Sequence, residues 1–326
     1  MESLHVCRDG GLEMIIAIDS TSRGPSLGGC RWRAYRDSLE ARRDATRLAR
    51  AMTFKTAMAR LSLGGGKAVV VGDPRERTDN QLRAFGSFVD TLGGRYITGA
   101  DMGTGKESML VIRQETSWGT GLPERVGGAG DPAPFTALGI LRALEPATAR
   151  AGFSLRGARV AVQGVGNVGA ELIQLLLAAG AEVFAADVSV EALSRLPTSV
   201  TRVAPDEVLE VECDIFAPCG PGNVIDLESA ERIECRVVCG GANNPLVTPD
   251  VACKLAERGI IYVPDFVANA GGVIHLALSL EGGDADETRN YLNVIPENVE
   301  AVLAQAKARH TDTATAAIAI ASYLAA

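Results

Sequence analysis

The chain of 326 residues is longer than one hydrophobic core usually supports, so its length favours two domains. A composition of 47% hydrophobic and 22% charged residues is ordinary for a soluble α/β protein, and the net charge of −8 argues against nucleic acid and anionic membranes as partners. The seven cysteines show no C-x-x-C or paired spacing, which argues against a disulfide framework and a structural zinc site and indicates a reducing compartment. With no apolar stretch of about 18 residues and no signal-like N-terminus, the sequence predicts a cytoplasmic protein.

Residues 1–134 are expected to form a mixed α/β domain. Its predicted elements are strands at 12–18 and 30–35, a helix from about 38 to 60, a strand at 68–71, a helix at 79–92 and a strand at 95–98. Asp37 or Ser38 can cap the long helix, whose apolar residues, beginning with Leu39, recur at three and four. We expect turns at 19–29 and at the triple glycine 64–66.

Residues 135–304 are expected to form the second domain, after a Gly- and Pro-rich boundary at 119–134, while the tail 305–326 is expected to pack back on the first domain. The predicted elements are helices at 135–149, 170–178, 268–280, 297–308 and 312–326, and strands at 159–163, 183–186, 199–203, 214–216, 237–239 and 260–263. This βα alternation predicts a doubly wound parallel sheet with right-handed crossovers.

The clearest motif is G-x-G-x-x-G between a predicted strand and a predicted helix. Gly164 permits the tight turn, Gly166 lets a pyrophosphate approach the backbone, and Gly169 lets the helix pack closely on the strand. The phosphates would bind the unpaired amides at the helix N-terminus, so this turn predicts a Rossmann-type domain that binds a dinucleotide. The residues expected at the phosphates are the three glycines with the intervening Val165, Asn167 and Val168.

Asp187 ends the strand that follows this helix. Its carboxylate would accept hydrogen bonds from the adenosine ribose hydroxyls. Val188 and Ser189 behind it offer no arginine for a 2′-phosphate. The sequence therefore favours NAD over NADP as the coenzyme.

Two lysines of the first domain stand in unusual surroundings. Lys55 ends an apolar stretch, and Lys67 follows three glycines at the start of a buried strand. Two ammonium groups that face one cleft would disfavour each other's protonation, and burial adds to that effect. We therefore expect one lysine to hold a carboxylate and the other to move protons.

Other polar residues lie where ligands usually bind. Asp101 lies in a glycine-flanked loop at a probable strand end, and Asn243 and Asn244 follow Gly240-Gly241 at the end of another strand. Each is equally compatible with an ordinary turn. His275 lies in an apolar helix pattern and is interpreted as a core histidine, and neither of the other two histidines suggests a metal site.

Several segments together resemble the Glu/Leu/Phe/Val dehydrogenase family. They are GGCRWRAY (28–35), MTFKTAMARLSLGGGKAVVVGD (52–73) and GGRYITGADMGT (93–104), with QGVGNVG, GGANN and PDFVANAGG. The likeness runs over nearly the whole chain, and the K-x(11)-K spacing with GGGK at its end is highly specific. It implies a substrate domain and an NAD-binding domain separated by a cleft, which hinge closure would shut during NAD-dependent reversible oxidative deamination of an L-amino acid to a 2-oxo acid and ammonia.

The resemblance also implies roles for individual residues. The lysine matching Lys55 binds the substrate carboxylate, the one matching Lys67 is the general base on the water that attacks the imine, and the aspartate matching Asp101 handles protons on the amino group. Other positions expected near the substrate or the coenzyme are Gly28, Thr136, Cys219, Ala242 and Asn243. Chain-end contacts in the family imply a homo-oligomer, a dimer or higher.

The expected side-chain pocket is apolar. By resemblance it is lined by Leu27, Gly99, Val273 and Leu276, with no lysine or serine for a γ-carboxylate, so glutamate is disfavoured. Gly99 stands where branched-chain enzymes tend to have alanine, and the missing methyl deepens the pocket. The predicted substrate is therefore phenylalanine or another aromatic amino acid, followed by leucine or valine.

Two other classes of function are compatible with a dinucleotide-binding half. A hydroxy-acid dehydrogenase would need a His–carboxylate pair as its base, which the three histidines do not offer in the sequence. A non-catalytic NAD-binding regulatory protein would show damaged catalytic positions, whereas Lys55, Lys67 and Asp101 are all present.

Overall fold

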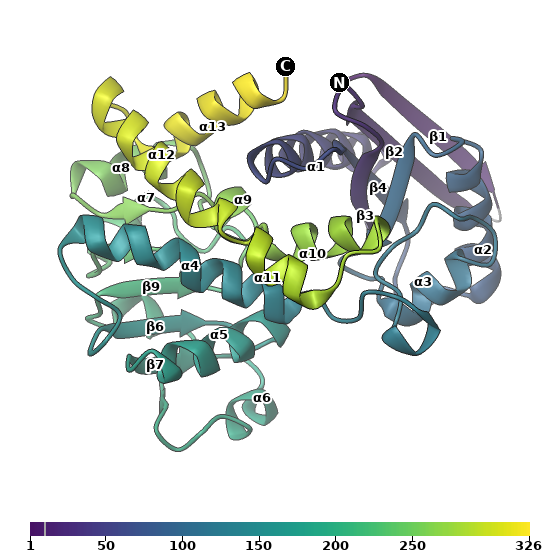
Figure 1. Cartoon of the computed structure of the whole chain (residues 1–326). Helices are drawn as coiled ribbons and strands as arrows, with labels where there is room; N and C mark the ends of the chain where they lie inside the picture. The colour runs from purple at the N-terminus through teal and green to yellow at the C-terminus, as the bar shows by residue number, and fades with distance from the viewer. Residues whose placement is uncertain (10) are drawn as a thin grey trace. The chain divides into compact units, whose positions relative to one another are not determined.

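The computed structural model describes residues 1–9 and 11–326, which divide into two compact units (Figure 1). Unit 1 comprises residues 1–132, 275–284 and 321–326, and unit 2 comprises residues 133–274 and 285–320. Among the described residues, no helix is long and apolar enough to cross a membrane.

Unit 1 contains a mixed five-stranded sheet in the order β1-β2-β4-β3-β5. Its strands are β1 (Ser3–Asp9), β2 (Leu12–Ser20), β3 (Ser26–Arg33), β4 (Gly64–Val71) and β5 (Tyr96–Ala100). Strands β1, β2 and β4 pair antiparallel, and β3 pairs parallel with both β4 and β5. The helices are α1 (Ser38–Met58), α2 (Asp79–Asp90) and α3 (Lys106–Ile112), with a short 3-10 turn at Glu124–Val126.

Helices cover both faces of this sheet. On one face Ala41, Ala45 and Ala49 of α1 pack on a cluster formed by Ile15, Ala17 and Val69. On the other face the main core of the unit gathers side chains of the sheet with those of α2 and α3, among them Trp32, Phe85 and Met109. Because successive strand residues point to opposite faces, Gly65, Lys67 and Val69 of β4 all point toward α1.

The predicted glycine turn at 64–66 is wrong, because these residues form the first part of β4. None of the three has a positive φ, so they are not needed for a turn. They are needed for close packing: a Cβ on Gly65 would lie 2.0 Å from the backbone nitrogen of Thr53 in α1, and one on Gly64 would lie 1.9 Å from the Ser20 carbonyl oxygen. Residues 26–29, expected in a turn, belong to β3 for a related reason, because a Cβ on Gly28 would lie 1.8 Å from the Gly66 carbonyl oxygen.

The remaining predictions for this part are mostly confirmed. The strand at 12–18, the long helix with Asp37 as its cap, the helix at 79–92 and the strand at 95–98 all exist with small shifts of their ends. Leu39, expected in the buried stripe of α1, is 54% exposed, because the alanines of the helix form the contact with the sheet. Strand β1 and helix α3 were not predicted.

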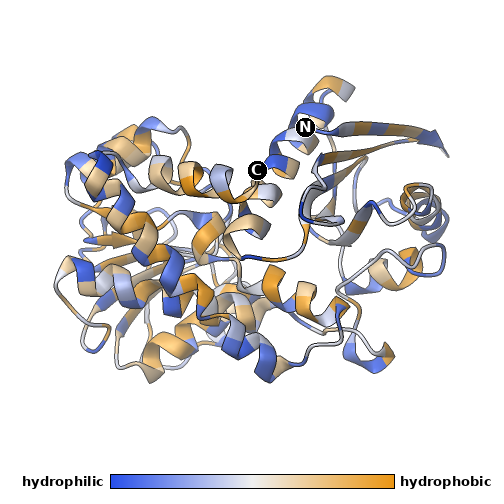
Figure 2. Ribbon diagram, turned by 45° about the horizontal axis from the view of Figure 1, so that its top comes forward, coloured by the Kyte–Doolittle hydropathy of each residue, from blue (hydrophilic) through white to orange (hydrophobic). Residues whose placement is uncertain are grey.

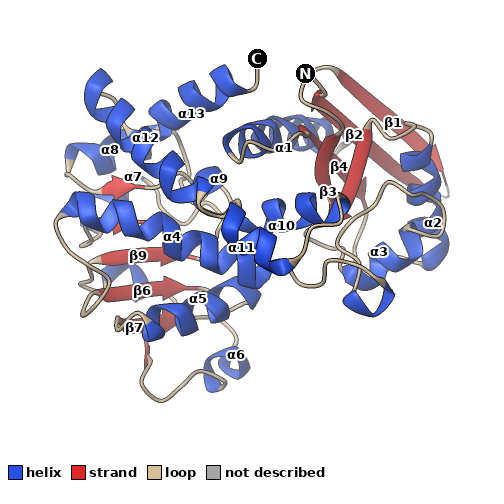
Figure 3. Cartoon of the chain, in the orientation of Figure 1, coloured by secondary structure: helices blue, strands red, loops and turns tan. Residues whose placement is uncertain are grey.

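Unit 2 contains a parallel six-stranded sheet in the order β8-β7-β6-β9-β10-β11. Figure 3 shows three of these strands, β7, β6 and β9, side by side. The strands are β6 (Arg159–Gln163), β7 (Glu182–Ala186), β8 (Thr201–Arg202), β9 (Ile215–Pro218), β10 (Val237–Val238) and β11 (Ile261–Tyr262). The chain begins in the middle of the sheet, and its direction of travel reverses between β6 and β9. This is the strand order of a Rossmann sheet, in which ligands bind at the reversal point.

Helices connect and cover these strands. They are α4 (Ala133–Ala151), α5 (Asn167–Ala178), α6 (Val190–Ser194), α7 (Leu227–Arg232), α8 (Asp250–Glu257), α9 (Asp265–Ala268), α11 (Ala285–Tyr291) and α12 (Val294–Arg309), with a 3-10 turn at Val208–Glu210. The unit boundaries fall within α10 (Gly271–Leu280) and α13 (Thr313–Leu324). The helices carry apolar and hydrophilic stretches in alternation (Figure 2), as expected for helices with one face on a core.

The predicted doubly wound parallel sheet is confirmed. The strand predicted at 159–163 has those bounds, and the strands predicted at 183–186, 199–203, 214–216, 237–239 and 260–263 all overlap observed strands. The helix predicted at 268–280 is α10, but Asp265–Ala268 forms a separate short helix before it. Helix α11 was not predicted.

We predict that Gly65→Ala destabilises the chain, because the new methyl group would collide with the backbone of α1 rather than with a flexible side chain. Overpacking of this kind costs about 1–3 kcal/mol, and a backbone contact belongs at the upper end. Thermal unfolding followed by circular dichroism measures the effect. The control is Gly105→Ala, where no heavy atom lies within 4 Å of the added carbon. Equal melting temperatures of the two variants would contradict the packing argument.

Candidate functional site

The glycine turn of unit 2 lies at the reversal point of its sheet. Gly164 has φ +94°, and a Cβ there would lie 2.5 Å from the backbone nitrogen of Gly220, next to the end of β9. A Cβ on Gly169 would lie 2.0 Å from the Gly164 carbonyl oxygen, whereas one on Gly166 would find no heavy atom within 4 Å. The structure therefore distinguishes two glycines required by packing from one that faces open space.

The open position suits a phosphate group. Gly166 is the N-cap of α5, and no side chain caps the amides of the first turn, which begins with Asn167 and Val168. Uncapped amides at a helix N-terminus, beside a residue without a side chain, can bind a pyrophosphate. The residues present thus fit a dinucleotide coenzyme at the turn.

Asp187 at the end of β7 holds the glycine turn itself. The amide of Val165 donates a hydrogen bond of 2.6 Å to its Oδ2, and the amide of Ser189 donates one of 2.7 Å to its Oδ1. Each carboxylate oxygen keeps a further lone pair for a ribose hydroxyl. Asp187 therefore stands where the sequence predicted a ribose ligand and also has a structural task that the sequence did not reveal.

Of the other predicted coenzyme residues, Cys219 and Ala242 follow the ends of neighbouring strands, whereas Thr136 lies in a helix. Cys219 comes directly after β9, and its amide donates to the Gln163 carbonyl oxygen at 2.6 Å. The amide of Ala242 donates to the Pro218 carbonyl oxygen at 2.8 Å, which draws the segment after β10 to the same edge. Thr136 lies in the first turn of α4, beside Gly271 at the start of α10.

The segment with Asn243 is fixed by two residues that sequence reasoning missed. Asn269, only 5% exposed, donates from Nδ2 to Asn243 Oδ1 at 3.0 Å and to the Gly241 carbonyl oxygen at 3.1 Å. Asp265 accepts a 2.8 Å hydrogen bond from the amide of Asn244, which has φ +50°. Both lie in PDFVANAGG, whose polar residues among small and apolar ones were the available signal.

The structure joins Lys67 and Asp101 in unit 1. Lys67 Nζ forms an ion pair with Asp101 Oδ2, and the Arg31 Nε lies 3.5 Å from the same oxygen. The side chains of Lys67, Arg31 and Asp101 are 9%, 13% and 22% exposed. Lys67 therefore has a carboxylate partner, an ion pair that the sequence analysis did not predict.

Asp101 fits between these cations because Gly29 has no side chain. A Cβ on Gly29 would lie 2.8 Å from the Asp101 Cβ. The loop after β5 is held by Thr104, whose hydroxyl lies 3.0 Å from the Asp101 amide and donates to the Cys30 carbonyl oxygen at 2.7 Å. Gly29 and Arg31 were missed, although both lie in the quoted segment GGCRWRAY.

The charges decide the ionisation of Asp101. Burial favours its neutral form, but Lys67 and Arg31 outweigh that effect and hold the pKa of Asp101 at about 2. Asp101 is therefore a carboxylate throughout the neutral range. In that state it can accept a proton or bind an ammonium group.

Lys55 lies in the last turn of α1, the helix that covers the Lys67 face of the sheet. Lys55 lies two positions after Thr53, whose backbone packs on Gly65. The direct helix–strand contact thus fixes the end of α1 from which Lys55 projects.

The expected side-chain pocket residues divide between the units. Leu27, Gly99 and Leu276 belong to unit 1, and Val273 belongs to unit 2. In unit 1, a Cβ on Gly99 would meet only Thr120 Cγ2, at the ordinary contact distance of 3.5 Å. Gly99 thus borders space that one methyl group could fill.

His275 is buried at 5% exposure, and its Nε2 hydrogen-bonds the Ala129 carbonyl oxygen at 2.8 Å. The interpretation of a core histidine is confirmed. Across residues 1–9 and 11–326, no three His, Cys, Asp or Glu side chains are grouped to hold a metal ion.

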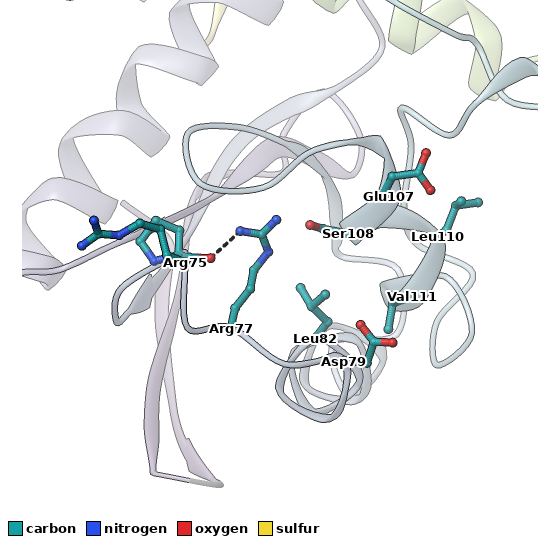
Figure 4. A pocket seen from close by; sticks show the side chains of 9 residues that line it. Arg75, Arg77, Asp79, Leu82, Glu107, Ser108, Leu110 and Val111 are labelled. Atoms are coloured by element: carbon teal, nitrogen blue, oxygen red, sulfur yellow. Dashed lines mark hydrogen bonds between the residues drawn. The ribbon is translucent and has the colours of Figure 1, made fainter.

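A separate surface hollow of about 500 Å³ lies between α2 and α3 in unit 1 (Figure 4). Its lining includes Arg75, Arg77, Asp79 and Glu107 and none of the predicted site residues. Arg75 forms an ion pair with Asp73, and Arg77 donates a hydrogen bond to the Pro74 carbonyl oxygen. The candidate functional residues are therefore the Lys67 cluster within unit 1 and, separately, the glycine turn within unit 2.

Comparison with known proteins agrees with this geometry. Residues 3–118 match the model of the Glu/Leu/Phe/Val dehydrogenase dimerisation domain, and residues 127–191 and 186–323 match that of Glutamate/Leucine/Phenylalanine/Valine dehydrogenase. The chain is 42% identical over 323 residues to a leucine dehydrogenase of Geobacillus stearothermophilus, with 97% of this chain and 88% of that protein covered. It is 43% identical over 316 residues to a valine dehydrogenase of Streptomyces virginiae, with 94% and 88% covered.

A solved structure is also similar over the whole chain. The L-tryptophan dehydrogenase of Nostoc punctiforme superimposes with a TM-score of 0.85 at 34% identity, covering 99% of this chain and 95% of that one. Relatives named for branched-chain substrates and one named for an aromatic substrate thus share this fold.

We predict that Asp101→Asn lowers the free energy of unfolding by about 2–3 kcal/mol at pH 7, because it leaves buried Lys67 without its anion and removes one of the two carboxylates beside Arg31. The pKa of about 2 in the folded chain lies below the unfolded value near 3.9, so the contribution is complete above about pH 4 and disappears as the pH falls toward 2. Urea unfolding at pH 7, 4 and 3 measures it. Exposed Asp90, changed to Asn, is the control. A wild-type advantage that stays constant down to pH 3 would contradict the ion-pair argument.

Proposed function

Since the chain belongs to the Glu/Leu/Phe/Val dehydrogenase family and is an oxidoreductase acting on CH–NH2 donors, we propose that it interconverts a branched-chain L-amino acid and its 2-oxo acid. The reaction is NAD-dependent oxidative deamination, with ammonia as the second product. The observation that carries the proposal is the buried ion pair of Lys67 and Asp101, with Arg31 beside it.

The residues of unit 1 act on protons and on the substrate carboxylate. Lys67 is the general base for the water that attacks the imine carbon. Asp101, ionised at neutral pH, binds the substrate ammonium group and so acts on its proton inventory. Lys55, in the last turn of α1, binds the substrate carboxylate as a point charge, aided by the close backbone at Gly28.

Unit 2 binds the coenzyme, which accepts a hydride from the substrate Cα in the oxidative direction. The amides around Gly166 bind its pyrophosphate, and Asp187 accepts hydrogen bonds from its adenosine ribose. Thr136, Cys219, Ala242 and Asn243 line the remainder of its site. Asp187, followed by Val188 without an adjacent arginine, supports NAD over NADP.

The relatives favour a branched-chain substrate over the aromatic one that the sequence suggested first. Leucine and valine dehydrogenases match at 42–43% identity over more than nine-tenths of this chain. The apolar residues Leu27 and Leu276 of unit 1 suit such a side chain. Gly99 leaves room for one more methyl group, so we favour leucine over the shorter valine.

A second candidate is an aromatic amino acid. Two observations support it: the space beside Gly99 and the similarity to a tryptophan dehydrogenase. The non-catalytic alternative is weaker, because Lys55, Lys67 and Asp101 are all intact.

We also propose a homo-oligomer. Residues 3–118 match a family domain described as a dimerisation domain. The other proposed partners of the chain are small molecules: the amino acid or 2-oxo acid and ammonia.

We predict a preference of the enzyme for one class of 2-oxo acid. NADH oxidation with ammonia and a panel of 2-oxo acids is expected to be fastest with 4-methyl-2-oxopentanoate and slower with phenylpyruvate or 2-oxoglutarate. NADH is expected to be preferred over NADPH. Lys67→Ala should lower kcat by about 10²–10⁴-fold, the usual contribution of a general base.

Lys307→Ala is the matched control, because this exposed lysine lies in the last turn of α12. It should retain wild-type activity. Full activity of Lys67→Ala, or no turnover of any 2-oxo acid by the wild type, would show the proposed mechanism to be wrong.

A further prediction concerns substrate size. Gly99→Ala is expected to fold normally, because its methyl group meets only Thr120 at 3.5 Å. It should lower kcat/KM for phenylpyruvate at least about 10-fold relative to 4-methyl-2-oxopentanoate, since one methyl group in an apolar pocket is worth about 10–200-fold. Steady-state kinetics with both acids checks the ratio, and an unchanged ratio would exclude Gly99 from the pocket.

A further inference from the structure

Arg31 on β3 lies between two carboxylates on the face of the sheet that α1 covers. Its Nη1 donates to Asp44 Oδ2 at 3.1 Å, and its Nε lies 3.5 Å from Asp101 Oδ2. Its side chain is 13% exposed, so the guanidinium is a buried cation. The roles proposed above give it no part in the reaction.

Arg31 and Lys67 share one oxygen of Asp101. Both cations contact Oδ2, and this atom is shielded from solvent. The 22% exposure of the side chain therefore comes from its other atoms, Cβ, Cγ and Oδ1. Oδ2 is thus the oxygen that holds both cations.

The shared oxygen matters when Lys67 acts as a base. To accept a proton, Lys67 must first be uncharged, and Asp101 would then be a buried carboxylate without its lysine. A buried charge left without a partner costs several kcal/mol. A guanidinium stays protonated at every working pH, so Arg31 can compensate Asp101 in both states of Lys67.

We propose that Arg31 is a positioning residue for the reaction: through Oδ2 it holds Asp101 as an anion while Lys67 changes its charge. The proposal rests on the function proposed above. Burial opposes the charge of Arg31, but Asp101 and Asp44 outweigh it and raise the pKa of the guanidinium above its ordinary value.

Asp44 of α1 holds the Arg31 guanidinium through a second ion pair. Its carboxylate also accepts hydrogen bonds from the Tyr35 hydroxyl at 2.8 Å and from Arg47 at 2.8 Å. Although burial raises the pKa of Asp44, Arg47, Tyr35 and Arg31 together hold it below the ordinary value. Asp44 therefore remains an anion that orients the guanidinium.

Two further titratable groups near Asp101 stay neutral. They are Cys30 on β3 and Tyr96 on β5, and burial raises the pKa of both well above neutrality. The cations that lower the pKa of Asp101 include Lys67 on β4 and Arg31 on β3, and Asp44 of α1 acts through Arg31.

The test is the pH profile of kcat/KM for oxidative deamination of the L-amino acid whose 2-oxo acid the wild type reduces fastest, because Lys67 acts as a base in this direction. Removing a cation favours the protonated forms of Lys67 and Asp101. Arg31→Gln should therefore move the acidic limb up by about one pH unit and lower kcat/KM at pH 7 about 10-fold. Arg31→Lys, which keeps the charge, should leave the limb near its wild-type position.

Asp44→Asn should shift the acidic limb of the pH profile in the opposite direction. It removes an anion and keeps Arg31, so the limb should move to lower pH by a fraction of a unit. The double variant R31Q/D44N removes the buried pair together, leaves no unpaired Asp44, and should move the limb up even if Arg31→Gln alone fails to fold.

Limb positions equal to wild type in D44N and in R31Q/D44N would overturn the proposal, because a merely structural Arg31 lowers activity equally at all pH values. Wild-type turnover is measured first, in both directions of the reaction. If the wild type reduces no 2-oxo acid, the proposed function fails and this proposal fails with it. An active wild type with unmoved limbs overturns the role of Arg31 alone.

Discussion

The direct contact between the backbone of α1 and the glycine residues of β4 sets the geometry of unit 1. At Gly65 the helix lies so close that no side chain fits between helix and strand. The neighbouring residue on that face, Lys67, is therefore covered by the helix and loses most of its contact with water. A lysine in this position requires an anion, which Asp101 supplies, and Asp101 in turn requires the second cation, Arg31.

The parts of the molecule that local sequence determines were predicted well. The strand β6, the turn at Gly164, the helix α5 and the end of β7 at Asp187 follow from apolar runs, glycine spacing and one acid, all within 30 residues. Lys67 and Asp101 were both selected as candidate site residues, and the structure joins them in an ion pair. The ion pair itself was not predicted, because the spacing in the chain does not show that their strands belong to one sheet.

The errors share a physical cause, which is packing between segments distant in sequence. Three consecutive glycines read as a turn, whereas they permit the approach of a helix whose closest residue, Thr53, lies 12 positions earlier. Alternation in Cys30-Arg31-Trp32 places Arg31 on the face opposite the core, which sequence reasoning treats as solvated. Helix α1 covers that face and makes Arg31 a buried charge. Likewise, the hydrogen bond between Asn269 and Asn243 joins residues 26 positions apart, so the local sequence does not reveal it.

Asp187, the proposed ribose ligand, also has a structural task, and this restricts how the coenzyme preference of such a chain can evolve. The carboxylate holds the Val165 amide inside the glycine turn and the Ser189 amide after the strand. Replacing it with a residue that tolerates a 2′-phosphate would also release the amide that fixes the turn. A change of coenzyme therefore cannot proceed through this one position. It needs a second substitution that supplies a new acceptor for Val165, so the two properties must change together.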